Sequence, residues 1–82
     1  MKLYIVTSLI ESQDEGAEVN IIGVEKTIEK AKSLMQEVLE QAKEMYEENN
    51  FEYDVEEYDD TIVISVDDNY ERIEYNMFEE EI

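Results

Sequence analysis

The sequence predicts an α+β domain of two layers, in which an antiparallel β-sheet of four or five strands packs on one long helix, in the order ββα(β)ββ. Two observations lead to this prediction. A central segment carries apolar residues at spacings of three and four, the period of a helix. On each side of it lie two short runs rich in β-branched and aromatic residues, with a polar turn between them, as in a β-hairpin.

The central helix is expected at residues 28–48. Its apolar residues fall within an arc of about 140° when successive residues are placed ~100° apart. They are Ile28, Ala31, Leu34, Met35, Val38, Leu39, Ala42, Met45 and Tyr46. Thr27 stands at the N-cap position, where its hydroxyl can accept from free backbone N–H groups. Asn49 and Asn50 can adopt the left-handed conformation that ends a helix.

Two strands are expected before the helix, at residues 2–10 and 19–24. The polar segment 11–16 joins them as a hairpin. We expect Gly16 to serve the hairpin loop, and Gly23 to mark a bulge or a point of close packing.

A second hairpin is expected after the helix, with strands at residues 61–66 and 70–77 and a turn at 67–69. The acidic residues 79–81 are expected to trail behind it. Residues 51–56 alternate strictly between apolar and acidic, which favours an additional edge strand over a loop.

The core is expected between the helix stripe and one face of the sheet. The sheet residues predicted to contribute are Leu3, Ile5, Val19, Ile21, Ile62, Ile64, Val66, Ile73, Tyr75 and Met77.

A chain of 82 residues has room for a single domain, which we expect to span residues 1–82. The chain has no cysteine and no histidine, which excludes disulfides, thiolate zinc sites and imidazole catalysis. No apolar run approaches the ~18 residues of a membrane span, and residues 1–10 lack the pattern of a signal peptide. We therefore expect a soluble, cytoplasmic protein that binds no membrane.

Charge is the main functional signal. The chain holds 24 acidic and 6 basic residues, a net charge of −18, which excludes direct binding of nucleic-acid phosphates. Residues 1–43 hold 8 acids and 5 bases, whereas residues 44–82 hold 16 acids and Arg72 alone. Carboxylates near a helix C-terminus and like charges at i,i+4 are each unfavourable by about 0.3–0.5 kcal/mol. A chain that keeps such arrangements repeatedly is expected to use them.

The carboxylates of the second half are the candidate partner-binding site. Three of them, Glu52, Asp54 and Glu56, are expected to project on one side of a strand at intervals of ~6.8 Å. The other candidates are helical, turn or hairpin acids and three tyrosines suited to stacking on arginine: Glu40, Glu44, Glu47, Glu48, Glu57, Asp59, Asp60, Asp67, Asp68, Tyr53, Tyr58 and Tyr70. Ordered carboxylates of this kind can occupy a basic groove in place of nucleic-acid phosphates.

Other interpretations stay open. Acidic runs are commonly solvated faces that serve solubility, and Tyr53 and Tyr75 are typical half-buried sheet residues. Residues 67–71 begin like a calcium loop, but Arg72 stands where that loop needs glycine and Phe78 where it needs glutamate, so no metal site is expected. No side chain is poised as a general base near neutral pH, and we expect neither catalysis nor a cofactor.

Three segments resemble small proteins of phages and mobile elements, the group that includes anti-CRISPR and anti-restriction inhibitors. They are the opening Lys2-Leu-Tyr-Ile-Val-Thr, the return strand Ile21-Ile-Gly-Val24 leading into Thr27-Ile-Glu-Lys-Ala-Lys32, and the acidic hairpin at the end. The resemblance lies in the overall plan and assigns a role to no individual residue. It implies an inhibitor in the bacterial cytoplasm that blocks the nucleic-acid site of a defence nuclease.

We therefore expect a non-enzymatic inhibitor of a nucleic-acid-binding bacterial defence effector, a CRISPR or restriction nuclease, whose phosphate ligand the acidic surface mimics. The alternative is a small acidic regulatory or adaptor module, dimeric through an exposed strand edge. The sequence leaves the oligomeric state open.

Overall fold

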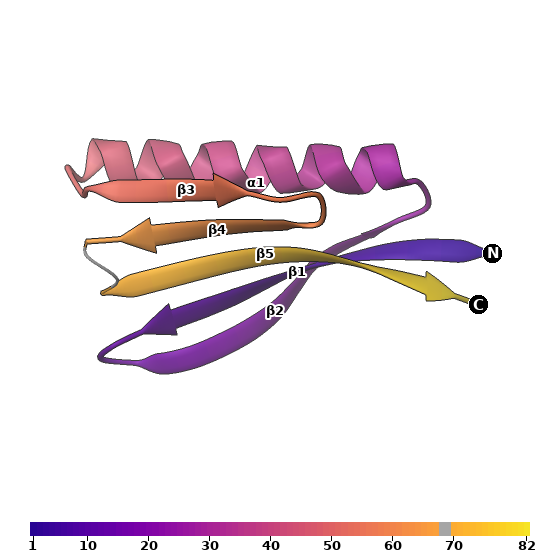
Figure 1. The fold of residues 1–82 in the computed structure, drawn as a ribbon, viewed down its shortest axis with the longest axis horizontal. Helices are drawn as coiled ribbons and strands as arrows, with labels where there is room; N and C mark the ends of the chain where they lie inside the picture. Colours follow the sequence, from indigo (N-terminus) through magenta and orange to yellow (C-terminus); the bar gives the residue numbers. More distant parts are fainter. Residues whose placement is uncertain (68–69) are drawn as a thin grey trace.

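The computed structural model describes residues 1–67 and 70–82, which form one helix and five strands (Figure 1). The strands are β1 (Lys2–Ser12), β2 (Gly16–Glu25), β3 (Tyr53–Glu57), β4 (Thr61–Val66) and β5 (Glu71–Glu81), and the helix is α1 (Ile28–Glu48). An α+β arrangement of one helix on an antiparallel sheet is thus confirmed. The sequence left the third strand optional; the structure contains it, with two strands before the helix and three after it. The predicted turn at 67–69 includes Asp68 and Asn69, which lie outside the described residues.

The sheet has the strand order β2-β1-β5-β4-β3, and every neighbouring pair is antiparallel. Strands β1 and β5 pair along their whole length, so the two chain ends lie together (Figure 1). Their backbones exchange two hydrogen bonds, from Met1 N to Ile82 O at 3.0 Å and from Ile82 N to Met1 O at 2.8 Å. The edge strands are β2 and β3.

Helix α1 begins and ends at the residues that its apolar spacing predicts. The Thr27 hydroxyl accepts from the backbone N–H of Lys30 at 3.2 Å, and Asn50 has φ 60°, the left-handed conformation expected after the C-terminus. The last turn of α1 contains no basic residue, so no cation on the helix itself offsets its C-terminal partial charge. Within the described residues, no helix combines the length and apolar character needed to cross a membrane.

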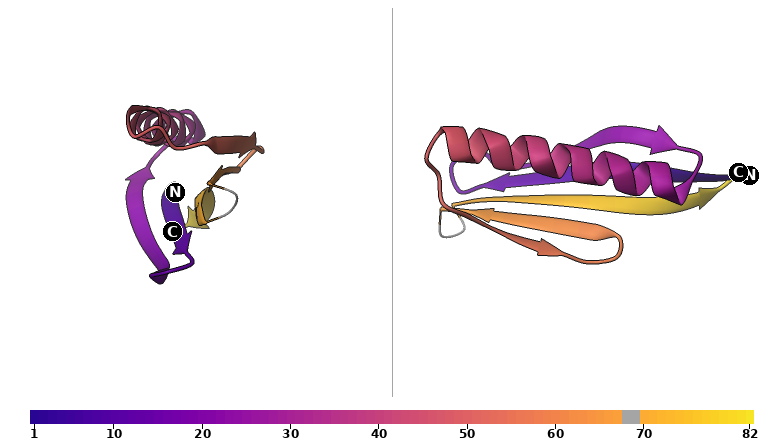
Figure 2. Two further views of the ribbon diagram at one scale, coloured as in Figure 1. Left: turned by 90° about the vertical axis from the view of Figure 1, so that its left-hand side faces the viewer. Right: turned by 90° about the horizontal axis from the view of Figure 1, so that it is seen from above.

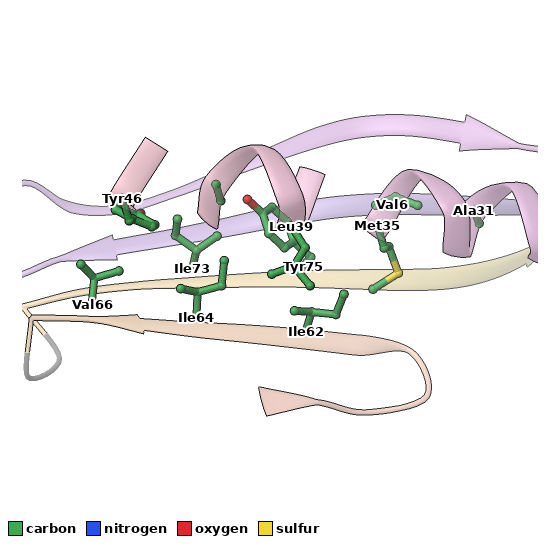
Figure 3. Packing of buried hydrophobic residues seen from close by; sticks show 11 residues of the cluster. Val6, Ala31, Met35, Leu39, Tyr46, Ile62, Ile64, Val66, Ile73 and Tyr75 are labelled. Carbon is green, nitrogen blue, oxygen red and sulfur yellow. The ribbon is translucent and has the colours of Figure 1, made fainter. Parts of the chain in front are cut away.

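The core lies between α1 and one face of the sheet (Figure 3). The side chains that fill it come from the helix and from the three central strands: Val6, Ala31, Met35, Leu39, Ala42, Tyr46, Ile62, Ile64, Val66, Ile73 and Tyr75. Tyr53 and Val55 of β3 pack partly against this cluster. We call the other side of the sheet, turned away from α1, the open face.

For four residues of the first hairpin, the prediction that they lie in the core was wrong. Val19 and Ile21 are 67% and 70% exposed, and Leu3 and Ile5 lie on the open face, because Val6 and Ser8 are the buried residues of β1. Strand β1 is apolar on both faces, so its pattern does not specify which set of alternate residues faces the helix.

Two residues at the margins of the helix stripe are also more exposed than predicted. Ile28 is 39% exposed and Met45 is 48% exposed. The sheet covers only the centre of the apolar arc, where Met35, Leu39 and Tyr46 are buried.

The segment 79–81, expected to trail behind the last hairpin, belongs to β5 instead. It pairs with Lys2, Leu3 and Tyr4 of β1. The Glu79 carboxylate accepts the Tyr4 hydroxyl at 3.3 Å and lies 3.5 Å from the Lys2 ammonium. Pairing with β1 therefore outweighs the low strand propensity of consecutive glutamates.

Gly23 has both of the roles expected for it. The register between β1 and β2 shifts at this point, because Val6 pairs with Gly23 while Thr7 pairs with Ile21, which leaves Ile22 as the extra residue of a bulge. A Cβ atom at Gly23 would lie 2.7 Å from Leu34 Cδ2, so the helix approaches β2 closely here.

Candidate functional site: the acidic edge

Strand β3 lies alongside α1, because the sheet curves around the helix (Figure 2). Two side-chain hydrogen bonds join these elements. The Tyr53 hydroxyl donates to the Glu47 carboxylate at 2.5 Å, and the Gln36 amide donates to the Glu57 carboxylate at 2.7 Å. The second half of the helix and the edge strand, both rich in acids, thus form one continuous border of the molecule.

We call this border the acidic edge. Its members are all exposed: Glu40, Glu44, Glu47, Glu48, Glu52, Asp54, Glu56, Glu57, Asp59 and Asp60. Lys43 partly compensates the helical part, at 3.6 Å from Glu40. Asp67 adjoins the acidic edge, since its backbone N–H donates to the carbonyl of Glu52 at 2.9 Å. The structure thus brings ten of the fifteen candidate residues together, on the second half of α1, on β3 and in the short segments that flank β3.

Within β3 the side chains alternate between the two faces of the sheet. Tyr53, Val55 and Glu57 face the helix side, whereas Asp54 and Glu56 lie on the open face. Glu52 immediately precedes the strand, so it continues the predicted row from outside β3. Asp59 and Asp60 occupy the turn that leads into β4.

Two tyrosines of the acidic edge hold carboxylates in place. The Tyr58 hydroxyl donates to Glu56 at 2.7 Å, as Tyr53 does to Glu47. In both cases the hydrogen bond to the carboxylate is the main cause of a raised tyrosine pKa. The sequence suggested stacking on arginine for these rings; in the structure their hydroxyls are already engaged with acids of the same chain.

Tyr70, a third candidate tyrosine, does not join the acidic edge. Its hydroxyl donates to Asp14 in the turn between β1 and β2, and that hydrogen bond is the main cause of its raised pKa. Its carbonyl accepts the backbone N–H of Gln13 at 3.1 Å in the same turn. Asp68, also a candidate, lies outside the described residues.

The open face also carries an ionic cluster that the sequence did not predict. The Arg72 guanidinium lies 2.9 Å from Glu74 and 3.4 Å from Glu11. Arg72 also pairs with Ser65, which pairs with Asp54, so the cluster continues across the sheet toward the acidic edge. The proximity of Arg72 to Glu11 follows from the register between β1 and β5, which the sequence alone does not give.

The acidic edge is suited to electrostatic binding. Its carboxylates are exposed, and on the open face they border a shallow hollow lined by residues such as Glu56, Tyr58 and Glu74. Among residues 1–67 and 70–82, no three acidic side chains converge in a way that could hold a metal ion. The arrangement therefore offers a row of fixed negative charges on a folded scaffold.

Comparison of the chain with protein-family models, with curated proteins and with solved structures found no match.

Proposed function

We propose that this protein is a non-enzymatic inhibitor that occupies the nucleic-acid site of a basic bacterial defence effector, a CRISPR or restriction nuclease, with the acidic edge in the place of the phosphates. The observation that supports this proposal most is that the carboxylates are both exposed and held. Glu47, Glu56 and Glu57 each accept a hydrogen bond from a side chain of the same chain. The site of action is then the bacterial cytoplasm.

Held carboxylates bind better than mobile ones for an entropic reason. Immobilising a rotamer-rich side chain on binding costs about 0.5–1.5 kcal/mol. Because Tyr53, Tyr58 and Gln36 already restrain their acceptors, this cost is reduced before the partner arrives. Binding also releases the counterions that the basic groove holds, as a nucleic acid would, so the affinity falls steeply with salt.

The test is a pull-down from a bacterial lysate with identification by mass spectrometry, followed by competition with duplex DNA and RNA. We expect the partner to be a nucleic-acid-binding protein, released by its own nucleic acid and by ~0.5 M salt. The triple variant Glu52→Gln, Asp54→Asn, Glu56→Gln is expected to lose it. A matched control, Glu15→Gln, Glu18→Gln, Glu29→Gln, removes three exposed acids elsewhere and is expected to retain it.

A captured partner that is indifferent to salt and to nucleic acid would contradict the proposal. Equal losses in the test and control variants would also contradict it, since net charge alone would then explain binding.

The alternative function, a regulatory or adaptor module that dimerises through a strand edge, is favoured by β2. This edge strand has ten residues and two acids, Glu18 and Glu25, whereas the edge strand β3 has three acids in five residues. Charged residues protect edges from pairing, so β2 is the less protected edge. Light scattering that shows an obligate dimer would support this alternative.

A further inference from the structure

The open face of the sheet divides into an apolar half and an acidic half. The apolar half comes from β2, β1 and the end of β5, and it comprises Ile5, Leu9, Val19, Ile21, Val24 and Phe78. Strand register places these residues side by side, because Leu9 pairs with Val19 and Ile5 pairs with both Val24 and Phe78.

The fold itself does not account for this apolar half. Helix α1 packs on the opposite face, and no other element of the described chain covers the open face (Figure 2). Val19, Ile21 and Phe78 remain 67%, 70% and 52% exposed. Scattered exposed apolar residues are ordinary, but a contiguous patch marks an interaction surface.

Charge restricts what can cover this surface. The acidic half of the same face holds Asp54, Glu56, Glu74 and Glu11, and Arg72 is already paired within it. With a net charge of −18 on the chain, a second copy, a nucleic acid or an anionic lipid surface would each add like charge beside it. A protein that presents apolar side chains flanked by lysine and arginine complements both halves.

We propose that the open face is the docking surface for such a basic, apolar-ridged protein, with the apolar half as the anchor and the carboxylates as the polar border. This inference rests on the proposed function, because the occupant is the same basic partner. It adds a second source of affinity, the burial of apolar surface, which salt does not screen. The acids accelerate association, whereas burial of Val19, Ile21 and Phe78 slows dissociation.

Two synthetic probes of equal charge separate these contributions. One is a helical peptide of leucine and lysine with an apolar face, and the other is oligolysine. Binding of each to the full chain is measured by fluorescence anisotropy at two salt concentrations. We expect the amphipathic peptide to bind about tenfold more tightly than oligolysine, corresponding to the burial of one or two aliphatic side chains. This tenfold difference should persist at high salt, where both affinities fall.

The decisive variant is Val19→Thr with Ile21→Thr, which keeps β-branched side chains on an exposed part of β2. It is expected to abolish the tenfold difference and to leave oligolysine binding unchanged. The matched control, Met45→Gln with Ile82→Thr, alters two exposed apolar residues outside the apolar half, 48% and 71% exposed, and is expected to retain the difference. Circular dichroism of each variant checks that the fold is kept.

The outcomes distinguish this inference from the proposed function. If the amphipathic peptide binds no better than oligolysine, or if the threonine variant keeps the difference, the apolar anchor is wrong and the acidic edge is unaffected. If oligolysine does not bind, the proposal that the acidic edge binds a basic partner is wrong. Sedimentation of the chain alone at ~0.05 and ~0.5 M salt is expected to show a monomer. A dimer that the threonine variant abolishes would show that a second copy of the chain covers the open face. That result would overturn the inference.

Discussion

Tyrosine hydroxyls position carboxylates throughout this protein. Five of the six tyrosines donate to an acid of the same chain, and Tyr75 is buried in the core. A phenol is a neutral donor, so it orders a carboxylate without cancelling its charge, which a lysine or arginine would do. These pairs therefore preserve the negative surface while restraining its side chains.

Tyr46 gives this chemistry a pH-dependent consequence. Its ring is buried against Phe51 and Tyr53, and its hydroxyl faces the Glu71 carboxylate at 3.5 Å. Burial, and then the negative charge of Glu71, raise the pKa of Tyr46 above its ordinary value of 10.0. The folded protein thus disfavours the phenolate more than the unfolded chain does. The resulting stability is complete below pH 10 and is lost as the pH rises from there toward the higher pKa of the folded state.

We therefore expect the free energy of unfolding to decline above pH 10, and to decline less steeply in Tyr46→Phe, which has no proton to lose. Urea unfolding followed by circular dichroism at several pH values from 8 to 11 measures this slope. Tyr58→Phe is the comparison: a hydrogen bond to Glu56 also raises the pKa of Tyr58, but this pair is exposed and screened by solvent, so its loss should change the slope less than the loss of buried Tyr46 does. Parallel declines in wild type and Tyr46→Phe would show that Tyr46 does not contribute.

At the scale of elements, the sequence predicts correctly those segments whose apolar residues define a single face. The prediction fails where a strand is apolar on both faces. Helix α1 and strand β4 match their predicted ranges because their apolar residues recur with a single period. Strand β1 is apolar on both faces, so the choice between Val6 and Ile5 as the buried residue depends on how the helix docks. For the candidate site, the sequence shows that acids are concentrated in the second half of the chain. It does not show the hydrogen bond from Tyr53 to Glu47, which depends on the position of β3 beside α1.

In the C-terminal turn of α1, the proposed function and helix stability favour opposite charges. This turn contains Glu47 and Glu48 and no base, although a negative charge is unfavourable at this end. We expect Glu48→Lys to stabilise the fold by about 0.5 kcal/mol, measured by urea unfolding at low salt, and to weaken binding of the proposed basic partner.

Glu47→Lys is the matched comparison one residue away. It makes the same favourable change at the helix end but removes the acceptor of the Tyr53 hydroxyl. Its gain in stability should therefore be smaller than that of Glu48→Lys. If Glu48→Lys lowers stability, the interpretation of these acids as a stability cost is wrong.

At the scale of the whole molecule, the −18 charge and the small core act against each other. The described core has eleven buried apolar residues beneath a single helix, and the carboxylates of the acidic edge repel one another across β3 and α1. Self-repulsion of this kind destabilises the compact state and is screened by salt. Salt, which is expected to weaken binding of the proposed basic partner, should therefore stabilise the fold.

We expect the melting temperature to rise between ~0.01 and ~0.5 M sodium chloride, a range over which the screening length falls from about 30 Å to a few ångströms. Glu52→Gln, Asp54→Asn, Glu56→Gln should melt about 5 °C higher than wild type at the low salt concentration, because removing three repelling carboxylates gains about 1 kcal/mol. Its melting temperature should also rise less with added salt, since fewer charges remain to be screened. Differential scanning calorimetry measures both effects. A variant that melts lower than wild type in low salt would mean that these carboxylates stabilise the fold, and the interpretation of the acidic edge as a surface kept for binding would lose its energetic support.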